Sequence, residues 1–166
     1  MIRIALPLVL LAAGCGNTSV SDLDMGAGAS SVVINELYPH GTGKADPDYA
    51  ELKNVSDAEV DVGGFKVRDS SLAHLYTIPS GTTIAAGGYL VLYCDDPKDG
   101  GVEGIYTGFG LSGKNGDDFH LLGKDGKDLD ATTFPSSLAS TKSWGRLPDG
   151  KGSFLEITPS MGKPNT

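Results

Sequence analysis

The sequence lacks an apolar run long enough to cross a membrane. Its longest apolar stretch, residues 4–13, is interrupted by Pro7 and falls well short of the roughly 20 residues that a spanning helix needs. It also lacks a window with convincing helical periodicity. What it has instead is 24 glycines and nine prolines in 166 residues, a composition that favours short strands joined by many turns. The length suits one domain.

Basic residues are scarce. Thirteen Lys and Arg stand against 21 Asp and Glu, which gives a net charge of −8 and a pI near 4.7. Such a chain repels phosphate backbones, so we expect no nucleic-acid partner.

Signatures of catalysis and of cofactor binding are also missing. The sequence has no nucleophile elbow, P-loop or dinucleotide-binding glycine pattern in a suitable context. Its three histidines, His40, His74 and His120, match no metal-ligand spacing. We therefore expect a protein that is not an enzyme and that has no cofactor.

The N-terminus has the three parts of a leader peptide: a charge at Arg3, the short apolar stretch, and small residues before Cys15. Residues 11–15 (LAAGC) resemble a lipobox, although Ala12 stands where a larger aliphatic residue is usual. We expect a bacterial lipoprotein signal peptide over residues 1–14 and lipidation of Cys15, which anchors the chain to a membrane. The alternative is an ordinary secretory signal with an incidental cysteine.

Residues 15–31 comprise the lipidated cysteine and a flexible tether rich in Gly, Ser and Ala. Gly16 carries no acidic retention signal, so we expect an exported protein held at the outer membrane. The second cysteine, Cys94, ends an apolar run and is expected to be a buried core residue rather than a reactive thiol.

Residues 32–166 form the predicted domain. Alternating and β-rich segments bounded by turn residues predict an all-β sandwich of about seven to nine short strands. The segments that carry this prediction are 32–38, 49–55, 59–62, 65–69, 75–78, 89–94, 118–122, 129–134, 143–147 and 154–157. The run at 89–94 is expected to be a central strand, and residues 123–127 a hairpin turn.

A series of short motifs follows in a defined order along this domain. They are residues 33–36 (VINE), 49–54 (YAELKN), 62–65 (VGGF), 78–82 (IPSGT), 84–89 (IAAGGY), 111–112 with 116–117 (LS, GD), 143–146 (SWGR) and 159–165 (PSMGKPN). Together they resemble the lamin tail domain, from about Val32 to Asn165. The resemblance implies an immunoglobulin-like β-sandwich that acts as an interaction module.

Five residues are expected to fix the core and the strand register: Asn35, Trp144, Arg146, Gly87 and Gly88. Gly87 and Gly88 allow a sharp entry into the following strand, and Trp144 anchors one end of the core. Arg146 is expected to pair with Glu36 or Glu51; a binding role for the same residues is the alternative.

Acidic side chains offer the candidate metal site. Asp46 and Asp48 follow a glycine-rich turn, with Glu36 and Glu51 nearby in the predicted strands, and oxygen ligands of this kind suit a divalent cation. Solvated turn carboxylates are the alternative.

Three functions remain open. The first is a non-enzymatic, lipid-anchored envelope protein whose domain binds or scaffolds an unknown protein or glycan. The second is a divalent-cation-dependent hydrolase, which requires the four carboxylates to converge in one pocket. The third is a purely structural envelope protein.

Overall fold

The computed structural model describes residues 30–43, 45–95 and 102–166. The predicted signal peptide, Cys15 and nearly all of the tether lie outside the described residues. Within the described part, no helix is long and apolar enough to span a membrane.

The described residues contain twelve strands, more than the seven to nine expected, and four of them have only two residues each. In chain order they are β1 (Val32–Tyr38), β2 (Tyr49–Asn54), β3 (Val60–Asp61), β4 (Lys66–Arg68), β5 (Tyr76–Thr77), β6 (Thr83–Ile84), β7 (Tyr89–Tyr93), β8 (Ile105–Tyr106), β9 (Gly116–Leu122), β10 (Asp128–Pro135), β11 (Ser143–Leu147) and β12 (Ser153–Ile157).

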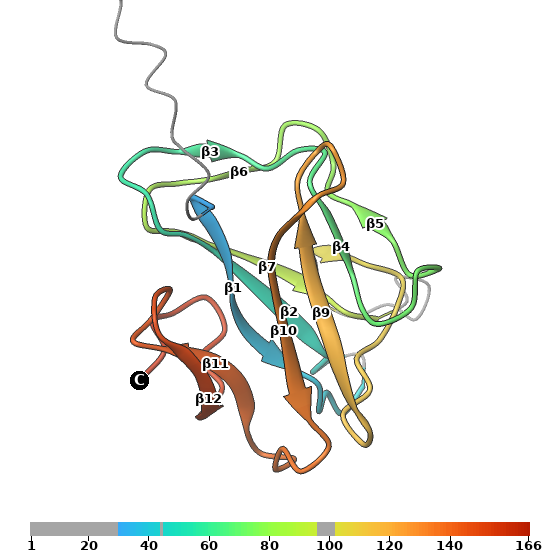
Figure 1. The fold of residues 1–166 in the computed structure, drawn as a ribbon. Helices are drawn as coiled ribbons and strands as arrows, with labels where there is room; N and C mark the ends of the chain where they lie inside the picture. Colours follow the sequence, from blue (N-terminus) through green and yellow to red (C-terminus); the bar gives the residue numbers. More distant parts are fainter. Residues whose placement is uncertain (1–29, 44, 96–101) are drawn as a thin grey trace, which may run out of the picture.

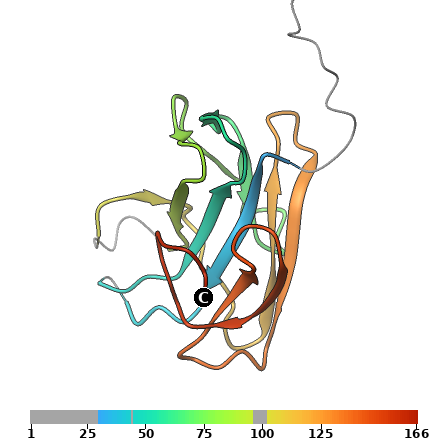
Figure 2. The ribbon, with the colours of Figure 1, turned by 90° about the vertical axis from the view of Figure 1, so that its left-hand side faces the viewer.

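The strands form an immunoglobulin-like β-sandwich, which confirms the predicted fold class. One sheet has six strands in the order β12-β11-β1-β2-β7-β8, and the other has four in the order β10-β9-β4-β5. Figure 1 shows β9 and β10 in front of β1 and β2, and in Figure 2 the orange β10 lies to the right of the blue β1. A small pair, β3-β6, lies at one end.

The core fills the space between the two sheets. Its fully buried members include Leu52 and Leu92 from the six-stranded sheet and Phe119, Leu121 and Phe134 from the four-stranded sheet. The alternation of apolar and polar residues along each strand places these side chains inward. The predicted run at 89–94 becomes β7, which lies between β2 and the short β8.

A β-bulge in β1 decides which side chains enter this core. Ile34 pairs with Leu52 and Glu36 pairs with Glu51, so Asn35 is an extra residue between two successive register pairs. The extra residue shifts the alternation by one position. As a result Ile34 and Leu37 are both in the core, while Glu36 turns to the outer face of the sheet.

Candidate functional site

Two carboxylates lie side by side on the outer face of the six-stranded sheet and yet are fully buried. Glu36 and Glu51 are register partners on β1 and β2, and both are 0% exposed. A buried charge is costly unless hydrogen bonds compensate it. Their burial therefore requires donors from the segment that contacts them, which is the C-terminal segment (residues 158–166).

The C-terminal segment supplies these donors. Ser160 donates its hydroxyl to Glu36 Oε2 over 2.6 Å and its backbone N–H to Glu36 Oε1 over 3.1 Å. Tyr49 donates its hydroxyl to the same Oε1 over 2.6 Å. Gly162 donates its backbone N–H to Glu51 Oε2 over 2.5 Å. Both carboxylates are thus bound by donors of the chain itself.

Asn35 and Asp149 extend these contacts into one buried carboxylate network, formed by Glu36, Glu51, Asp149, Asn35 and the C-terminal segment. The Asn35 amide donates to Glu51 Oε1 over 2.8 Å and to Asp149 Oδ1 over 3.0 Å. Its own oxygen accepts the Gly150 N–H over 2.9 Å. Asn165 donates its side-chain amide to the Asn35 carbonyl and its backbone N–H to Asp149. The bulge residue therefore joins β1 and β2 to the β11–β12 turn and to the C-terminal segment.

The two acids at either side of Asn35 have opposite pKa shifts. Burial raises the pKa of Glu51 to about 7, although hydrogen bonds from Asn35 and Gly162 act in the opposite direction. Burial also favours the neutral form of Asp149, but hydrogen bonds from Lys53, Asn165, Tyr89 and Asn35 outweigh it and hold the pKa of Asp149 below its usual value. The Lys53 ammonium lies 2.9 Å from Asp149 Oδ2. Asp149 is therefore the ionised acid of the pair at neutral pH, whereas Glu51 is close to half-protonated.

Arg146 pairs with Asp130, and the predicted partners Glu36 and Glu51 were wrong. Its Nη2 lies 2.8 and 2.9 Å from the two Asp130 oxygens, while its Nε donates to the Ile34 carbonyl over 2.8 Å. Asp130 in turn accepts the Ile34 N–H. The bulge explains the difference, because it turns Glu36 to the opposite face. The Arg146–Asp130 pair therefore links β11 of one sheet to β10 of the other, and both residues also bind the backbone of Ile34 in β1.

The other residues expected to fix the core lie as follows. Trp144 is half-buried, donates its indole N–H to Thr132 Oγ1 over 3.2 Å, and stacks on Phe154. Gly87 has φ +66°, a conformation that favours glycine, and Gly88 accepts the Asn54 N–H just before β7 begins.

Asp46 and Asp48 lie in the loop between β1 and β2. Asp48 accepts backbone N–H groups from Gly41 and Leu111 over 2.7 and 3.1 Å, and burial raises its pKa despite these bonds. Asp46 accepts the hydroxyl of Thr42. Asp48 lines a hollow of about 160 Å³ together with the buried Cys94. Cys94 is 1% exposed and burial raises the pKa of its thiol, as expected for a core residue.

The structure divides the four carboxylates proposed for a metal. Glu36 and Glu51 are in the network, whereas Asp48 alone of the four lines the hollow. Across residues 30–43, 45–95 and 102–166 there is no group of three or more His, Cys, Asp or Glu side chains that could hold a metal ion. Two histidines contact single carboxylates, His74 with Asp69 and His120 with Asp128.

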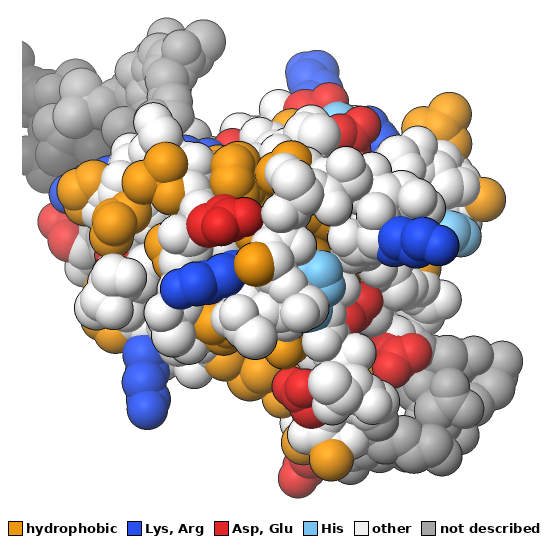
Figure 3. Space-filling view, turned by 90° about the horizontal axis from the view of Figure 1, so that it is seen from below, with side chains coloured by type: hydrophobic (Ala, Val, Ile, Leu, Met, Phe, Trp, Pro, Cys, Tyr) orange, Lys and Arg blue, Asp and Glu red, His pale blue; other side chains and the backbone are white. Residues whose placement is uncertain are grey.

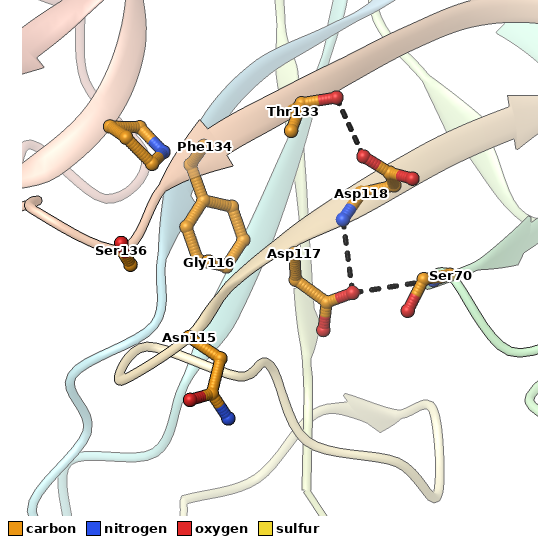
Figure 4. A pocket seen from close by; sticks show the side chains of 9 residues that line it. Ser70, Asn115, Gly116, Asp117, Asp118, Thr133, Phe134 and Ser136 are labelled. Carbon is orange, nitrogen blue, oxygen red and sulfur yellow. Dashed lines mark hydrogen bonds between the residues drawn. The ribbon is translucent and has the colours of Figure 1, made fainter.

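The sequence did not indicate two adjacent hollows beside β9 and β10, of which Figure 4 shows the first. A hollow of about 370 Å³ is lined by polar groups that include Ser70, Asn115, Asp117 and Ser136. A second hollow, of about 300 Å³, is lined by Asp118, His120, Ala131, Thr132 and Thr133. Asp118 and Thr133 line both hollows, so the two are adjacent. We call them the β9–β10 groove.

Hydrogen bonds hold the walls of the β9–β10 groove. Thr133 donates its hydroxyl to Asp118 Oδ1 over 2.6 Å, across the two strands. Asp117 accepts backbone N–H groups from Ser70, Ser112 and Asp118. The groove thus presents hydroxyl, amide and carboxylate groups on a rigid strand pair. In the view from below, acidic side chains recur across the surface and lysine or arginine side chains stand singly (Figure 3).

The fold and the site together define the class of protein as an immunoglobulin-like module. Its buried carboxylates, Glu36 and Glu51, accept hydrogen bonds from the chain itself. The chain belongs to the lamin tail domain family, whose model matches residues 26–136. A comparison with curated proteins finds no significant match. The family match includes β1 to β10, while β11, β12 and the C-terminal segment follow it and complete the six-stranded sheet and the network.

Sequence reasoning missed Asp130, Asp149 and Ser160 as partners in these contacts. Asp149 stands in the Pro-Asp-Gly turn that the sequence does indicate, and Ser160 stands in the last motif of the family resemblance. Both signals indicate turns, and neither indicates which distant side chain the turn contacts.

Proposed function

We propose that this chain is an exported lipoprotein, anchored to the outer membrane through lipid on Cys15, whose lamin tail domain binds or scaffolds an envelope protein or polysaccharide without catalysing a reaction. The immunoglobulin-like module is consistent with a non-enzymatic binding or structural role. The lipobox-like residues 11–15 support the anchor. The acidic surface supports a partner other than nucleic acid.

The observation that carries the binding role is the β9–β10 groove. Its carboxylate, hydroxyl and amide groups can hydrogen-bond to sugar hydroxyls or to peptide amides. Because Asp118 and Thr133 are on paired strands and already bonded to one another, their orientation is set before a ligand arrives. A rigid, open and polar surface suits recognition.

The hydrolase alternative has less support. It requires Asp46, Asp48, Glu36 and Glu51 to meet in one pocket, whereas the hollow beside Cys94 is lined by Asp48 and by none of the other three. The oxygens of Glu36 accept hydrogen bonds from Ser160 and Tyr49, and those of Glu51 accept them from Asn35 and Gly162. A purely structural envelope protein is the other alternative, and the binding experiment separates it from the proposal.

The binding role is tested by changing the groove in the full-length protein. Asp118→Ala with Thr133→Val removes the polar pair, and Asp57→Ala at an exposed turn is the matched control. Purified envelope polysaccharide and a detergent extract of envelope proteins are presented to each variant, with calcium or with EDTA. We expect one fraction to be retained by the control and at least tenfold less by the groove variant. Retention of neither fraction, or equal retention by both variants, would contradict the proposal.

The anchor has a separate test. Wild-type protein should incorporate radiolabelled palmitate and partition into the detergent phase, and Cys15→Ser should do neither. Density-gradient separation of the two membranes then reports the location. Wild-type protein in the aqueous phase would refute lipidation without affecting the binding role.

A further inference from the structure

Each of the two large sheets has two edges, at which the outermost strand has backbone N–H and C=O groups that no neighbouring strand pairs. Natural proteins protect such edges, because another strand can add to them. The edge strands are β12 and β8 in the six-stranded sheet and β10 and β5 in the four-stranded sheet. β5 and β8 have two residues each and offer few groups for pairing. The edges long enough to pair with another strand are therefore those of β10 and β12.

The β10 edge is protected. A bulge at Leu129 interrupts the register between Asp128 and Asp130. Pro135, which has no N–H group, ends the strand. The Asp130 carboxylate accepts the N–H of Ala131 over 3.0 Å, so this donor is bound within the strand itself. Bulges, prolines and charged side chains are the features by which edge strands avoid pairing.

The β12 edge lacks this protection. Its five residues (SFLEI) pair with β11 without a register shift, and they include no proline, glycine or lysine. β12 ends the order of its sheet, so its other side pairs with no strand of the described residues. Figure 1 shows β11 and β12 at the lower left of the molecule. β12 therefore presents a regular edge to a further strand.

The segments next to β12 leave this edge open. The C-terminal segment follows β12 but turns across the outer face of the sheet, where Ser160 binds Glu36. The β10–β11 connection contacts β12 through the Ala139 N–H, which donates to the Glu156 carboxylate over 3.4 Å. Neither of these contacts involves the backbone of β12.

An exposed leucine lies at the centre of β12. Leu155 is 48% exposed. It lies opposite Gly145, which pairs with Glu36 of β1, so it is on the outer face of the sheet. Gly145 has no side chain that could cover it, and Leu147 beside them is also exposed. A strand added at this edge would cover apolar surface in addition to pairing backbone groups.

A second copy of the chain suits this edge better than the chain's own remaining segments. Residues 16–29 are rich in Gly, Asp and Ala, and residues 96–101 include a proline and two glycines, all of which are depleted in strands. Two identical strands, by contrast, pair antiparallel about a two-fold axis that passes between their central residues. For β12 the central residue is Leu155. It then lies opposite the partner's Leu155, and Ser153 lies opposite the partner's Ile157.

We propose that two copies of the chain associate through β12, whose two copies pair antiparallel about a two-fold axis and join the six-stranded sheets into one. Each Leu155 is covered by its symmetry mate. Because this contact is small, the dimer is weak in solution. Holding both copies on one membrane through the proposed anchor raises their local concentration and the fraction of dimer.

The dimer presents two binding surfaces together. Side chains opposite each other on paired strands are on the same face of a sheet, so both four-stranded sheets lie on one side of the joined sheet. The two β9–β10 grooves are therefore on one side of the dimer, where a repeating polysaccharide can engage both and bind more tightly than to one. This use rests on the proposed function, whereas dimerisation does not.

The first test is sedimentation equilibrium of the full-length Cys15→Ser protein, at concentrations up to about 500 μM because the expected complex is weak. The mass should rise from that of one chain, 17.1 kDa, toward twice this value. Leu155→Lys places two like charges at the two-fold axis and should weaken association about tenfold. Leu129→Lys makes the same change at the protected β10 edge and should have no effect, and circular dichroism confirms that both variants are folded. A monomer at every concentration, or a dimer that Leu155→Lys leaves intact, would overturn the proposal.

The second test assigns the register. In the Cys15→Ser background the remaining Cys94 is buried, so an added cysteine is the single accessible one. Opposite Cα atoms of antiparallel strands are about 4.5–5.5 Å apart, which suits a disulfide, so mild oxidation should link Leu155→Cys into a dimer. The two copies of Ser153 are about 14 Å apart in this register, and Ser153→Cys should stay monomeric. Linkage of Ser153→Cys, or none of Leu155→Cys, would overturn the proposal and leave the groove test unaffected.

Discussion

Glu51 gives the most direct test of the buried carboxylate network. Its pKa is raised from 4.5 to about 7 in the folded protein, so folding favours its protonated form. Its contribution to stability is therefore complete below pH 4.5 and is lost as the pH rises to 7. A shift of this size corresponds to about 3 kcal/mol of unfolding free energy. Glu51→Gln removes the titration, so the stability of wild type relative to the variant should fall by about this amount across the same interval.

The measurement is urea denaturation at several pH values between 4.5 and 7.5, followed by the fluorescence of Trp144, the single tryptophan. Asp48, whose pKa is also raised, is common to both proteins and cancels in the difference. Glu59→Gln makes the same chemical change at an exposed carboxylate and should leave the difference from wild type independent of pH. A difference between wild type and Glu51→Gln that is constant over this range would refute the reasoning.

Three further predictions concern the architecture. Arg146→Met should lower the unfolding free energy by about 3–5 kcal/mol because it leaves the partly buried carboxylate of Asp130 without its cation. In a double-mutant cycle with Asp130→Asn, the two losses of unfolding free energy should be far from additive, and additive losses would argue against the pair. Gly145→Ala should lower the stability by about 1–3 kcal/mol, since a Cβ there would lie 2.3 Å from Cδ1 of Ile157; an unchanged urea midpoint would show that the site has room. In a Cys15→Ser background Cys94 should resist a thiol reagent at pH 8 and react fully in urea, and rapid labelling of the folded protein would contradict its burial.

The strands were predictable because their signals are local. Alternation and turn residues locate β1 and β11 to the residue, and Gly126, with φ +82°, occupies the predicted hairpin turn. β6 and β8 have two residues each, which is too short for a periodic pattern to be recognised. Their pairing depends on neighbours that are distant in sequence.

The contacts of the site were less predictable, because a single inserted residue changes them. The pattern of β1 reads as a regular strand, and the bulge at Asn35 depends on partners up to 130 residues away. In a regular strand the Glu36 side chain would point inward, on the same face as Arg146 and within its choice of ion-pair partners.

The C-terminal segment also has a consequence for how the chain reaches its folded state. Ser160 binds Glu36 across 124 residues and Asn165 binds Asn35 across 130. Contacts this remote form late, because the chain between them must first be brought together. Until residues 158–166 dock on the sheet, Glu36 lacks the donors of Ser160 and Glu51 lacks the donor of Gly162. The buried acids of β1 and β2 thus acquire their full set of donors only in the last step of folding, when this segment docks.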